Sequence, residues 1–281
     1  MKKHPTLKRA CALALAALLA AASLPAAADQ MADIKSKGEL VCGVLGTDEP
    51  FSFIKDPANR EIVGYDVDIC HAVAKSLGVK PVLRQLAGAA RIPELQQGRV
   101  DLLAASLTHN REREAQIDFS LSVFVTGQKV MVKKSSGVTQ LGQLADKKVM
   151  TMKGSTMELN TKKALPTAQI VSFDSSPQAF LALQQGKGVG YVNDETSLVN
   201  NFSKLGSAAK DYVILPESIS VEHLALGIKK GEPAWREQVN KVLRELEASG
   251  DAEKLFMKWF GPTTNMGFTA RTFRIESDKI D

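Results

Sequence analysis

Apolar residues along the chain follow two alternating patterns: short continuous runs, and longer segments in which they recur every three or four positions. Short runs are typical of buried strands, and the longer pattern is typical of helices with one buried face. We predict strands over residues 40–45, 61–65, 79–83, 100–106, 148–152, 169–173 and 189–192, and helices over residues 66–77, 91–97, 111–117, 177–185, 233–248 and 251–260, with a further helix opening at 154–156. Asp66 is the predicted cap at the start of the first helix, and Gly78 is the predicted cap at its end. Because strands and helices alternate, we expect an α/β sheet that is largely parallel.

The order of predicted elements occurs twice. The letters ELQQGR at residues 94–99 are echoed by ALQQGK at residues 182–187, each at the end of a predicted helix. Between the two units, residues 119–133 are rich in strand-forming side chains, and residues 220–228 follow the second unit with the same character. The sequence therefore predicts two lobes built alike, with these two segments crossing between them. The polar tail after Gly261 is expected to wrap the surface.

The first 28 residues have the pattern of a signal peptide. Four basic residues precede an apolar run at 10–22, and the small residues Ala26, Ala27 and Ala28 follow it. The apolar run is too short for a comfortable membrane span, and no later stretch replaces it. We expect cleavage after Ala28 and export of a soluble protein to the periplasm.

Loss of this segment changes the charge of the protein. The full chain has 36 Lys and Arg against 31 Asp and Glu, a net charge of +5. Four of the basic residues lie in the first 28, so the mature chain keeps 32 basic and 31 acidic residues, or +1. The basic excess that would have suggested a nucleic-acid partner is thus largely removed, and we expect no such partner.

Two cysteines remain after Cys11 is removed with the signal. Cys42 lies on the first predicted strand and Cys70 on the first predicted helix, which must pack against each other. An oxidising compartment favours a disulfide between them. This bond would close a loop of about 29 residues, which is worth roughly 3–4 kcal/mol. The alternative is two buried free thiols.

The segment Ser106–Arg113, with the sequence SLTHNRER, carries the first candidate binding chemistry. It follows a predicted strand and opens a predicted helix, with Thr108 or Asn110 as N-cap, at the sheet edge where α/β proteins bind ligands. Arg111 and Arg113 occupy the first turn, where the helix dipole disfavours cations by roughly 0.3–1 kcal/mol each. Hydroxyls, free N–H groups and a guanidinium together suit a carboxylate or a phosphate. The alternative is a solvated first turn in which neighbouring glutamates offset the arginines.

Seven motifs in a fixed order resemble the family 3 solute-binding proteins, the amino-acid receptors of ABC importers. They are GYDVD at 64–68, LQQGRVD at 95–101, SLT at 106–108 with Arg113, DFS at 118–120, GST at 154–156, NDE at 193–195 and KWFG at 258–261. The resemblance runs from about Gly38 to Gly261. It implies the type II periplasmic-binding-protein fold: two similar α/β lobes, joined by two hinge strands, with the ligand in the cleft. Lobe 1 would comprise residues 29–124 and 225–281, and lobe 2 residues 125–224.

The resemblance also implies the role of individual residues. Arg113 would pair with the α-carboxylate of an L-amino acid, and Asp194 would hold its α-ammonium group. A planar guanidinium suits a planar anion, and a carboxylate suits a cation. Closure of the cleft would exclude water and strengthen both pairs. Further α-carboxylate contacts are expected from Ser106, Thr108, Ser155 and Thr156.

The pocket for the ligand side chain is less well defined by the sequence. Many members of the family carry aromatic residues where this chain has Asp48 and Ala89, so a stacking pair is absent here. Phe51 and Tyr65 are candidate walls of the pocket, or else residues of the core.

Features of the sequence favour two different classes of ligand side chain. Residues 91–93, Arg-Ile-Pro, resemble the glutamate/aspartate-binding branch, in which the arginine contacts the side-chain carboxylate. However, Leu45 and Ser176 stand where that branch has an arginine and a histidine. The pair Cys42 and Cys70 resembles a different branch, which accepts several polar amino acids.

Together these features predict a periplasmic receptor that delivers a polar L-amino acid, with an acidic one (glutamate or aspartate) favoured by Arg91, to the inner-membrane permease of an ABC importer. We expect a monomer without a cofactor, and the scattered histidines predict no metal site. The alternative is a dehydratase-like periplasmic enzyme on the same fold, with Glu195 as general acid. The export signal argues against a transcription regulator, and no Gly-x-Ser-x-Gly elbow is present for a nucleophile.

Overall fold

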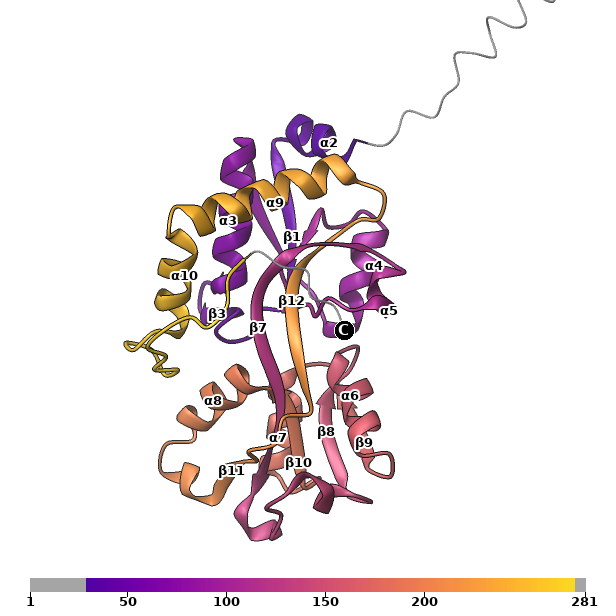
Figure 1. The fold of residues 1–281 in the computed structure, drawn as a ribbon, viewed down its shortest axis with the longest axis vertical. Helices are drawn as coiled ribbons and strands as arrows, with labels where there is room; N and C mark the ends of the chain where they lie inside the picture. Colours follow the sequence, from indigo (N-terminus) through magenta and orange to yellow (C-terminus); the bar gives the residue numbers. More distant parts are fainter. Residues whose placement is uncertain (1–28, 276–281) are drawn as a thin grey trace, which may run out of the picture.

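Two lobes are joined by two long strands in the computed structural model, which describes residues 29–275. The predicted signal peptide at residues 1–28 lies outside this range. The connecting strands are β7 (Asp118–Lys133) and β12 (Ser220–Ile228), which pair antiparallel and run from one lobe into the other (Figure 1). The predicted two-lobed α/β fold is confirmed. The residue limits of each lobe stay a prediction, because both hinge strands are continuous.

Lobe 1 is assembled from the chain before β7 and the chain after β12 (Figure 1). Its strand β1 pairs parallel with both β5 and β6, and β2, β3 and β4 form a small antiparallel sheet. The strands are β1 (Glu39–Val44), β2 (Thr47–Asp48), β3 (Ser52–Asp56), β4 (Glu61–Val63), β5 (Lys80–Gln85) and β6 (Leu102–Leu103). The helices are α2 (Gln30–Lys37), α3 (Tyr65–Leu77), α4 (Arg91–Gln96), α5 (Arg111–Glu114), α9 (Pro233–Ala248) and α10 (Asp251–Phe260).

Lobe 2 is one continuous stretch of chain between the two hinge strands. Its strands are β8 (Lys148–Met152), β9 (Gln169–Phe173), β10 (Gly190–Asp194) and β11 (Tyr212–Ile214), and its helices are α6 (Thr156–Ala164), α7 (Ser176–Gln184) and α8 (Glu195–Lys204). The large sheet is continuous through both lobes, in the order β5-β1-β6-β12-β7-β10-β8-β9. The lobes are therefore connected by hydrogen-bonded strands.

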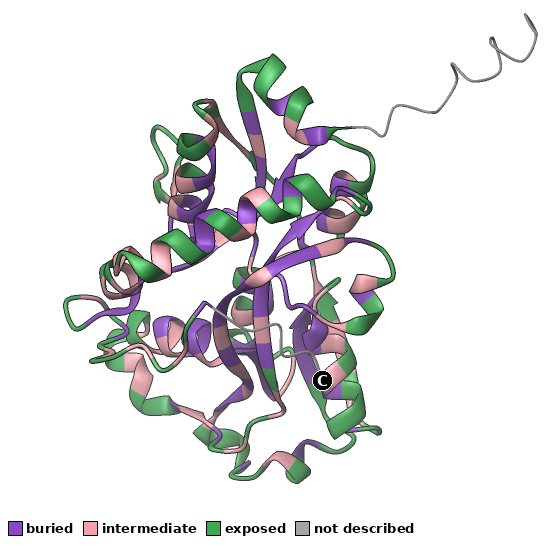
Figure 2. Ribbon diagram, turned by 45° about the horizontal axis from the view of Figure 1, so that its top comes forward, coloured by how far each residue is buried: buried purple, intermediate pink, exposed green. Residues whose placement is uncertain are grey.

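Aromatic side chains dominate the core of lobe 1. The rings of Phe51 and Phe124 have centroids 5.0 Å apart, and those of Phe124 and Phe260 are 4.7 Å apart. Trp235 of α9 is fully buried, and its indole N–H donates to the carbonyl oxygen of Asp101 at 3.1 Å. Figure 2 shows that buried residues concentrate on the strands and the inner helix faces. Within residues 29–275, no helix is both long and apolar enough to cross a bilayer.

Two local predictions are corrected by the structure. The N-cap of α3 is Gly64, not Asp66, because the helix begins at Tyr65. A glycine is needed at this cap, since an added Cβ would lie 2.1 Å from the carbonyl oxygen of Phe51. Asp66 instead lies in the first turn of α3. The predicted strand 100–106 is shorter in the structure, where β6 comprises only two residues, and Ser106 has a positive φ that a strand does not allow. The C-cap at Gly78 is confirmed.

The segment after Gly261 also differs from its prediction. It does not simply cover the surface, because Met266 and Ile275 are buried and Phe268 and Phe273 pack against the core of lobe 1. Arg271 forms a half-buried, bidentate ion pair with Glu247 of α9, with both N···O distances at 2.7 Å. The segment is thus an integral part of lobe 1.

The structure contains the expected disulfide. It joins Cys42 of β1 to Cys70 of α3, 28 residues apart in the sequence, and both residues are fully buried. The bond fixes the first strand of lobe 1 to its first helix. Such a cross-link stabilises the protein chiefly by restricting the unfolded chain.

We predict that replacing both Cys42 and Cys70 with alanine lowers the free energy of unfolding by roughly 3–4 kcal/mol, the value expected for a loop of this length. Denaturant unfolding followed by circular dichroism measures this difference. A thiol reductant should lower the stability of the wild type by a similar amount and leave the double variant unchanged. Equal stability of wild type and variant would show that the bond contributes nothing.

Candidate functional site

A small polar cavity lies between the two lobes, at the level of the hinge strands. Its volume is about 10 Å³, enough for one water molecule. An amino acid can enter only if the lobes separate. The cavity is lined from lobe 1 by Leu45, Asp48, Arg91, Ser106, Thr108 and Arg113, from the hinge by Gln128, and from lobe 2 by Met152, Ser155, Thr156, Met157, Ser176, Asn193 and Asp194.

Arg113 is held in the cavity by the first turn of α5. The side chain of Asn110, the N-cap of α5, accepts the backbone N–H of Arg113 at 2.9 Å, which confirms Asn110 as the cap. The guanidinium donates to the carbonyl oxygens of Thr108 at 2.8 Å and Gly154 at 3.2 Å. Burial lowers the pKa of Arg113 to about 10, with Glu222 acting in the opposite direction, so the group stays charged at neutral pH. These two bonds leave N–H donors of the guanidinium available to an anion.

Arg91 is more completely engaged with the protein than Arg113. It donates to the carbonyl oxygens of Gly88 at 2.9 Å, Ala105 at 2.8 Å, Ser106 at 3.3 Å and Gly154 at 3.2 Å. Burial lowers its pKa to about 9, and the charge of Arg113 acts in the same direction. These four bonds use most of its five N–H donors. Arg91 therefore offers a ligand little more than one N–H and its charge.

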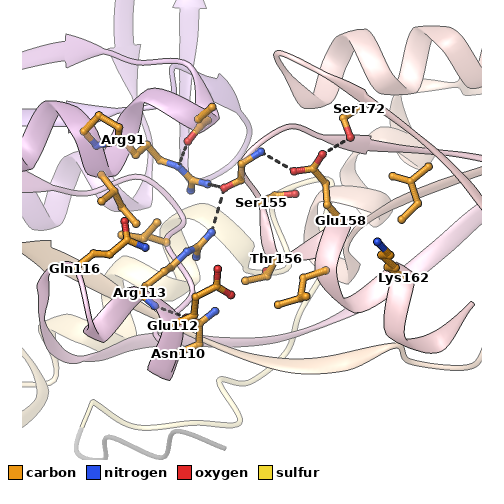
Figure 3. Close-up of a pocket in the computed structure, with 18 residues that line it drawn as sticks. Arg91, Asn110, Glu112, Arg113, Gln116, Ser155, Thr156, Glu158, Lys162 and Ser172 are labelled. Carbon is orange, nitrogen blue, oxygen red and sulfur yellow. Dashed lines mark hydrogen bonds between the residues drawn. The ribbon is translucent and has the colours of Figure 1, made fainter. Parts of the chain in front are cut away.

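The carbonyl oxygen of Gly154 accepts from both arginines, which reach it from lobe 1 across the cleft (Figure 3). Beside this contact lies a larger groove of about 660 Å³, which shares Arg91, Arg113, Ser155 and Thr156 with the cavity. The two lobes also touch closely here, since a Cβ added at Gly154 would lie 2.6 Å from the Cα of Ala89. The groove and the closed cavity thus lie on either side of the same residues.

A network of hydrogen bonds surrounds the start of α6. The hydroxyl of Thr156 donates to Glu222 at 2.9 Å and accepts from the side-chain amide of Gln128 at 2.9 Å. The hydroxyl of Thr108 lies 3.2 Å from that of Thr156. Asn160 donates to Glu222 at 2.8 Å and to Gln128 at 3.1 Å. Since the Thr156 hydroxyl is already engaged, α6 offers an anion mainly its free backbone N–H groups and its positive dipole end.

Asp194 is a buried carboxylate with incomplete partners. It ends β10 and is the N-cap of α8, and its Oδ1 atom has no hydrogen-bond partner among the residues that the structure describes. Burial raises its pKa well above the ordinary value, with the negative charges of Asp48 and Glu222 acting in the same direction. An unpaired carboxylate in such a place is strongly stabilised by a cation.

Ser106 has a strained backbone, with φ of +47°. The strain is supported by Asp66, whose carboxylate accepts the backbone N–H of Ser106 at 2.8 Å. Burial raises the pKa of Asp66 to about 7, and the bond from the Ser106 N–H acts in the opposite direction. Backbone strain of this kind is found at binding sites, where the surrounding structure holds it in place.

The structure thus brings most of the predicted site residues into one cavity. Phe51 and Tyr65 are not among them, because both lie in the aromatic core of lobe 1 and are at most 1% exposed. Glu195 also lies outside the cavity lining, and its carboxylate pairs with Lys129 at 2.6 Å. Within the described residues, no three His, Cys, Asp or Glu side chains are arranged to hold a metal ion.

Sequence reasoning assigned no role to four polar residues of the site, one of which, Asn193, appears only within the motif at 193–195. Asp48 was noted only as the replacement of an aromatic residue, and Gln128 and Glu222 on the hinge strands were not singled out. A signal for the last two was present, because a polar side chain in an apolar hinge strand needs a buried partner.

A model of the bacterial extracellular solute-binding proteins, family 3, matches residues 40–262. The chain belongs to this family. Among relatives of this family 3 protein, the ABC transporter glutamine-binding protein GlnH of Bacillus subtilis (strain 168) is 31% identical and covers 82% of this chain and 84% of its own. The glutamate/aspartate import solute-binding protein of Escherichia coli (strain K12) is 31% identical, with coverages of 89% and 86%.

A solved structure supports the same assignment of fold. The ancestral amino acid-binding protein AncCDT-1, described as a precursor of cyclohexadienyl dehydratase, matches this family 3 protein with a TM-score of 0.75 and 31% identity. The match covers 82% of this chain and 99% of that one. The relatives are thus amino-acid-binding proteins of ABC importers, and they differ in their named ligands.

We predict that the stability of the protein falls as pH rises from about 4 to about 7. The folded state keeps the Asp66 proton up to about pH 7, whereas the unfolded chain loses it near 3.8, so the folded state binds more protons in this window. The loss due to Asp66 is roughly 4 kcal/mol at most. Asp66→Asn keeps an acceptor for the Ser106 N–H and removes the titration. Denaturant unfolding at several pH values should show a shallower decline for Asp66→Asn, and identical slopes would contradict the assignment.

Proposed function

We propose that the protein is an extracytoplasmic receptor that captures a polar L-amino acid between its lobes and presents it to the permease of an ABC importer. One observation carries this proposal: Arg113, with free donors, and Asp194, with an unpartnered oxygen, line the same buried cavity. The zwitterionic end of an amino acid supplies one charge for each of them. Membership of family 3 and the named ligands of the relatives support the same class.

The α-carboxylate is assigned to Arg113 and the start of α6. A guanidinium and a helix N-terminus together form a favourable anion site. In this assignment the carboxylate replaces the Gly154 carbonyl oxygen as acceptor of the Arg113 guanidinium. The hydroxyl of Thr108 and the groups of Ser106, Ser155 and Thr156 complete the proposed contacts.

The α-ammonium group is assigned to Asp194. This pairing relieves the cost of a buried carboxylate that has like charges nearby. Gln128 and Asn193 line the same part of the site and are added to the proposed contacts. Phe51 and Tyr65 are left out, because their rings belong to the core.

The side chain of the ligand is assigned to the end of the cavity near Arg91 and Asp48. The positive charge of Arg91 favours an acidic ligand, glutamate or aspartate. One of the relatives is named for those two amino acids. Another is named for glutamine. Arg91 has few free donors, so Asp48 has a large influence on the choice between these classes.

Transport rather than catalysis is the proposed role. A general acid must reach the reacting atoms, and Glu195 is ion-paired with Lys129 outside the cavity lining. We further propose that residues 1–28 direct the chain to the periplasm and that it acts there as a monomer. Closure of the lobes would then change the outer surface that a permease recognises.

Arg113→Ala is predicted to weaken the binding of every amino acid by two orders of magnitude or more. It removes one partner of a buried charge pair, at a cost of roughly 3–5 kcal/mol. Isothermal titration calorimetry against the common amino acids measures the effect. Arg111→Ala is the matched control, because Arg111 lies in the same turn of α5 but outside the cavity lining, and it should bind like the wild type. Unchanged affinity in Arg113→Ala would contradict the proposed function.

Gly88→Ala is predicted to reduce affinity by hindering closure. An added Cβ at Gly88 would lie 2.8 Å from the carbonyl oxygen of Lys153 on the other lobe. Overpacking of this kind costs about 1–3 kcal/mol, which corresponds to roughly a fivefold to hundredfold loss of affinity. In the control, Gly142→Ala, the added Cβ has no neighbour within 4 Å, and affinity should be unchanged. If both variants bind equally well, close contact at this seam is not needed.

A further inference from the structure

Asp48 is an acidic residue that lines the cavity. It lies in β2 of lobe 1, and only 7% of it is exposed. Its Oδ1 atom accepts from the hydroxyl of Ser197 in α8, across the cleft, at 2.9 Å. Burial raises its pKa, whereas the hydroxyls of Ser106 and Ser197 and the charge of Arg91 act in the opposite direction. An ionised carboxylate has about four acceptor positions, so it keeps acceptor capacity for a ligand.

The cavity lining holds two guanidinium groups and two carboxyl groups, and further carboxyl groups lie just behind it. Arg91 and Arg113 face Asp48 and Asp194 in the lining. Two more carboxylates lie behind: Asp66, which accepts from Ser106, and Glu222, which accepts from Thr156. A further negative charge is disfavoured beside these carboxyl groups, because burial already raises the pKa of Asp48, Asp66 and Asp194.

The proposed function uses Arg113 for the α-carboxylate and Asp194 for the α-ammonium. Arg91 and Asp48 then remain for the side chain. Arg91 has most of its N–H groups bound to backbone carbonyls, so it can give roughly one hydrogen bond to a ligand acceptor. While it is ionised, the carboxylate of Asp48 can only accept hydrogen bonds, so a ligand group that contacts it must supply an N–H donor.

We propose that Asp48 makes the site selective for a side chain that ends in a carboxamide and against one that ends in a carboxylate. A carboxamide presents a carbonyl oxygen to Arg91 and an NH₂ group to Asp48. A carboxylate in the same place meets Asp48 as a desolvated like charge. A guanidinium supplies donors to Asp48 but brings a second cation against Arg91. This assignment rests on the proposed function, and it differs from the acidic ligand that Arg91 alone suggests.

Calorimetric titration of the purified protein at neutral pH with L-glutamine, L-asparagine, L-glutamate, L-aspartate and L-arginine tests the assignment without any variant. We expect the better amide to bind at least roughly tenfold more tightly than the acid of the same length, since buried polar groups discriminate strongly against an unmatched partner. Tighter binding of either acid overturns the assignment. Tighter binding of L-arginine than of both amides overturns it as well.

Variants of Asp48 provide the second measurement. Asp48→Asn should shift the ratio of amide to acid affinity toward the acid by roughly tenfold or more. Ser197→Ala is the comparison variant, because it removes the hydrogen bond to Asp48 but keeps the carboxyl group, and its ratio should stay closer to that of the wild type than the ratio of Asp48→Asn does. Asp48→Ser serves where Asp48→Asn does not fold, as judged by circular dichroism. Equal weakening of all ligands in a folded Asp48 variant overturns the selective role.

The two proposals fail in different ways. If the wild type binds no amino acid, the proposed function itself fails. If the wild type binds amino acids, prefers an acid, and keeps that preference in Asp48→Asn, the receptor function stands and only the role of Asp48 is overturned.

Discussion

Charged groups that are removed from water must find partners, and the closed cavity between the lobes satisfies this requirement only in part. Arg91 and Arg113 reach across the cleft to the same carbonyl oxygen, whereas Asp194 has an oxygen with no partner among the described residues. Burial disfavours every one of these charges. Pairing a buried charge is worth far more than pairing one at the surface, because the surrounding medium screens it less. The cavity is therefore stabilised most by a molecule that carries both signs of charge at a short separation.

The hinge strands determine how the charged groups of the two lobes lie relative to one another. Strands β7 and β12 continue the sheet of each lobe, so the lobes can move as bodies while their cores stay packed. Two hinge side chains, Gln128 and Glu222, are hydrogen-bonded to Thr156 at the start of α6. The candidate site and the hinge strands thus share one hydrogen-bond network. Small residues at the seam, Gly88 and Gly154, allow backbone to meet backbone when the lobes close.

Periodicity in the sequence located many elements well, because each of these is set by its own apolar face. Strands β8, β9 and β12 and helices α9 and α10 have the predicted limits. Periodicity does not show features that depend on distant residues. It predicts Asp66 as a helix cap, whereas the carboxylate of Asp66 accepts from the backbone N–H of Ser106, 40 residues further on. In the same way, the importance of Asp48 is visible only from its hydrogen bond with Ser197, 149 residues away. The apolar residues of the tail are scattered among polar ones, so their pattern does not predict burial. Their burial is evident only from their contacts with lobe 1.

The interrupted path of the chain through lobe 1 has a consequence for synthesis. Lobe 2 is contiguous, so all its strands are available as soon as that stretch has been made. Lobe 1 must wait for α9, whose Trp235 fills its core and bonds to Asp101, 134 residues earlier. Contacts of such long range form late and slowly. The core of lobe 1 therefore stays incomplete in the nascent chain until α9 has been synthesised.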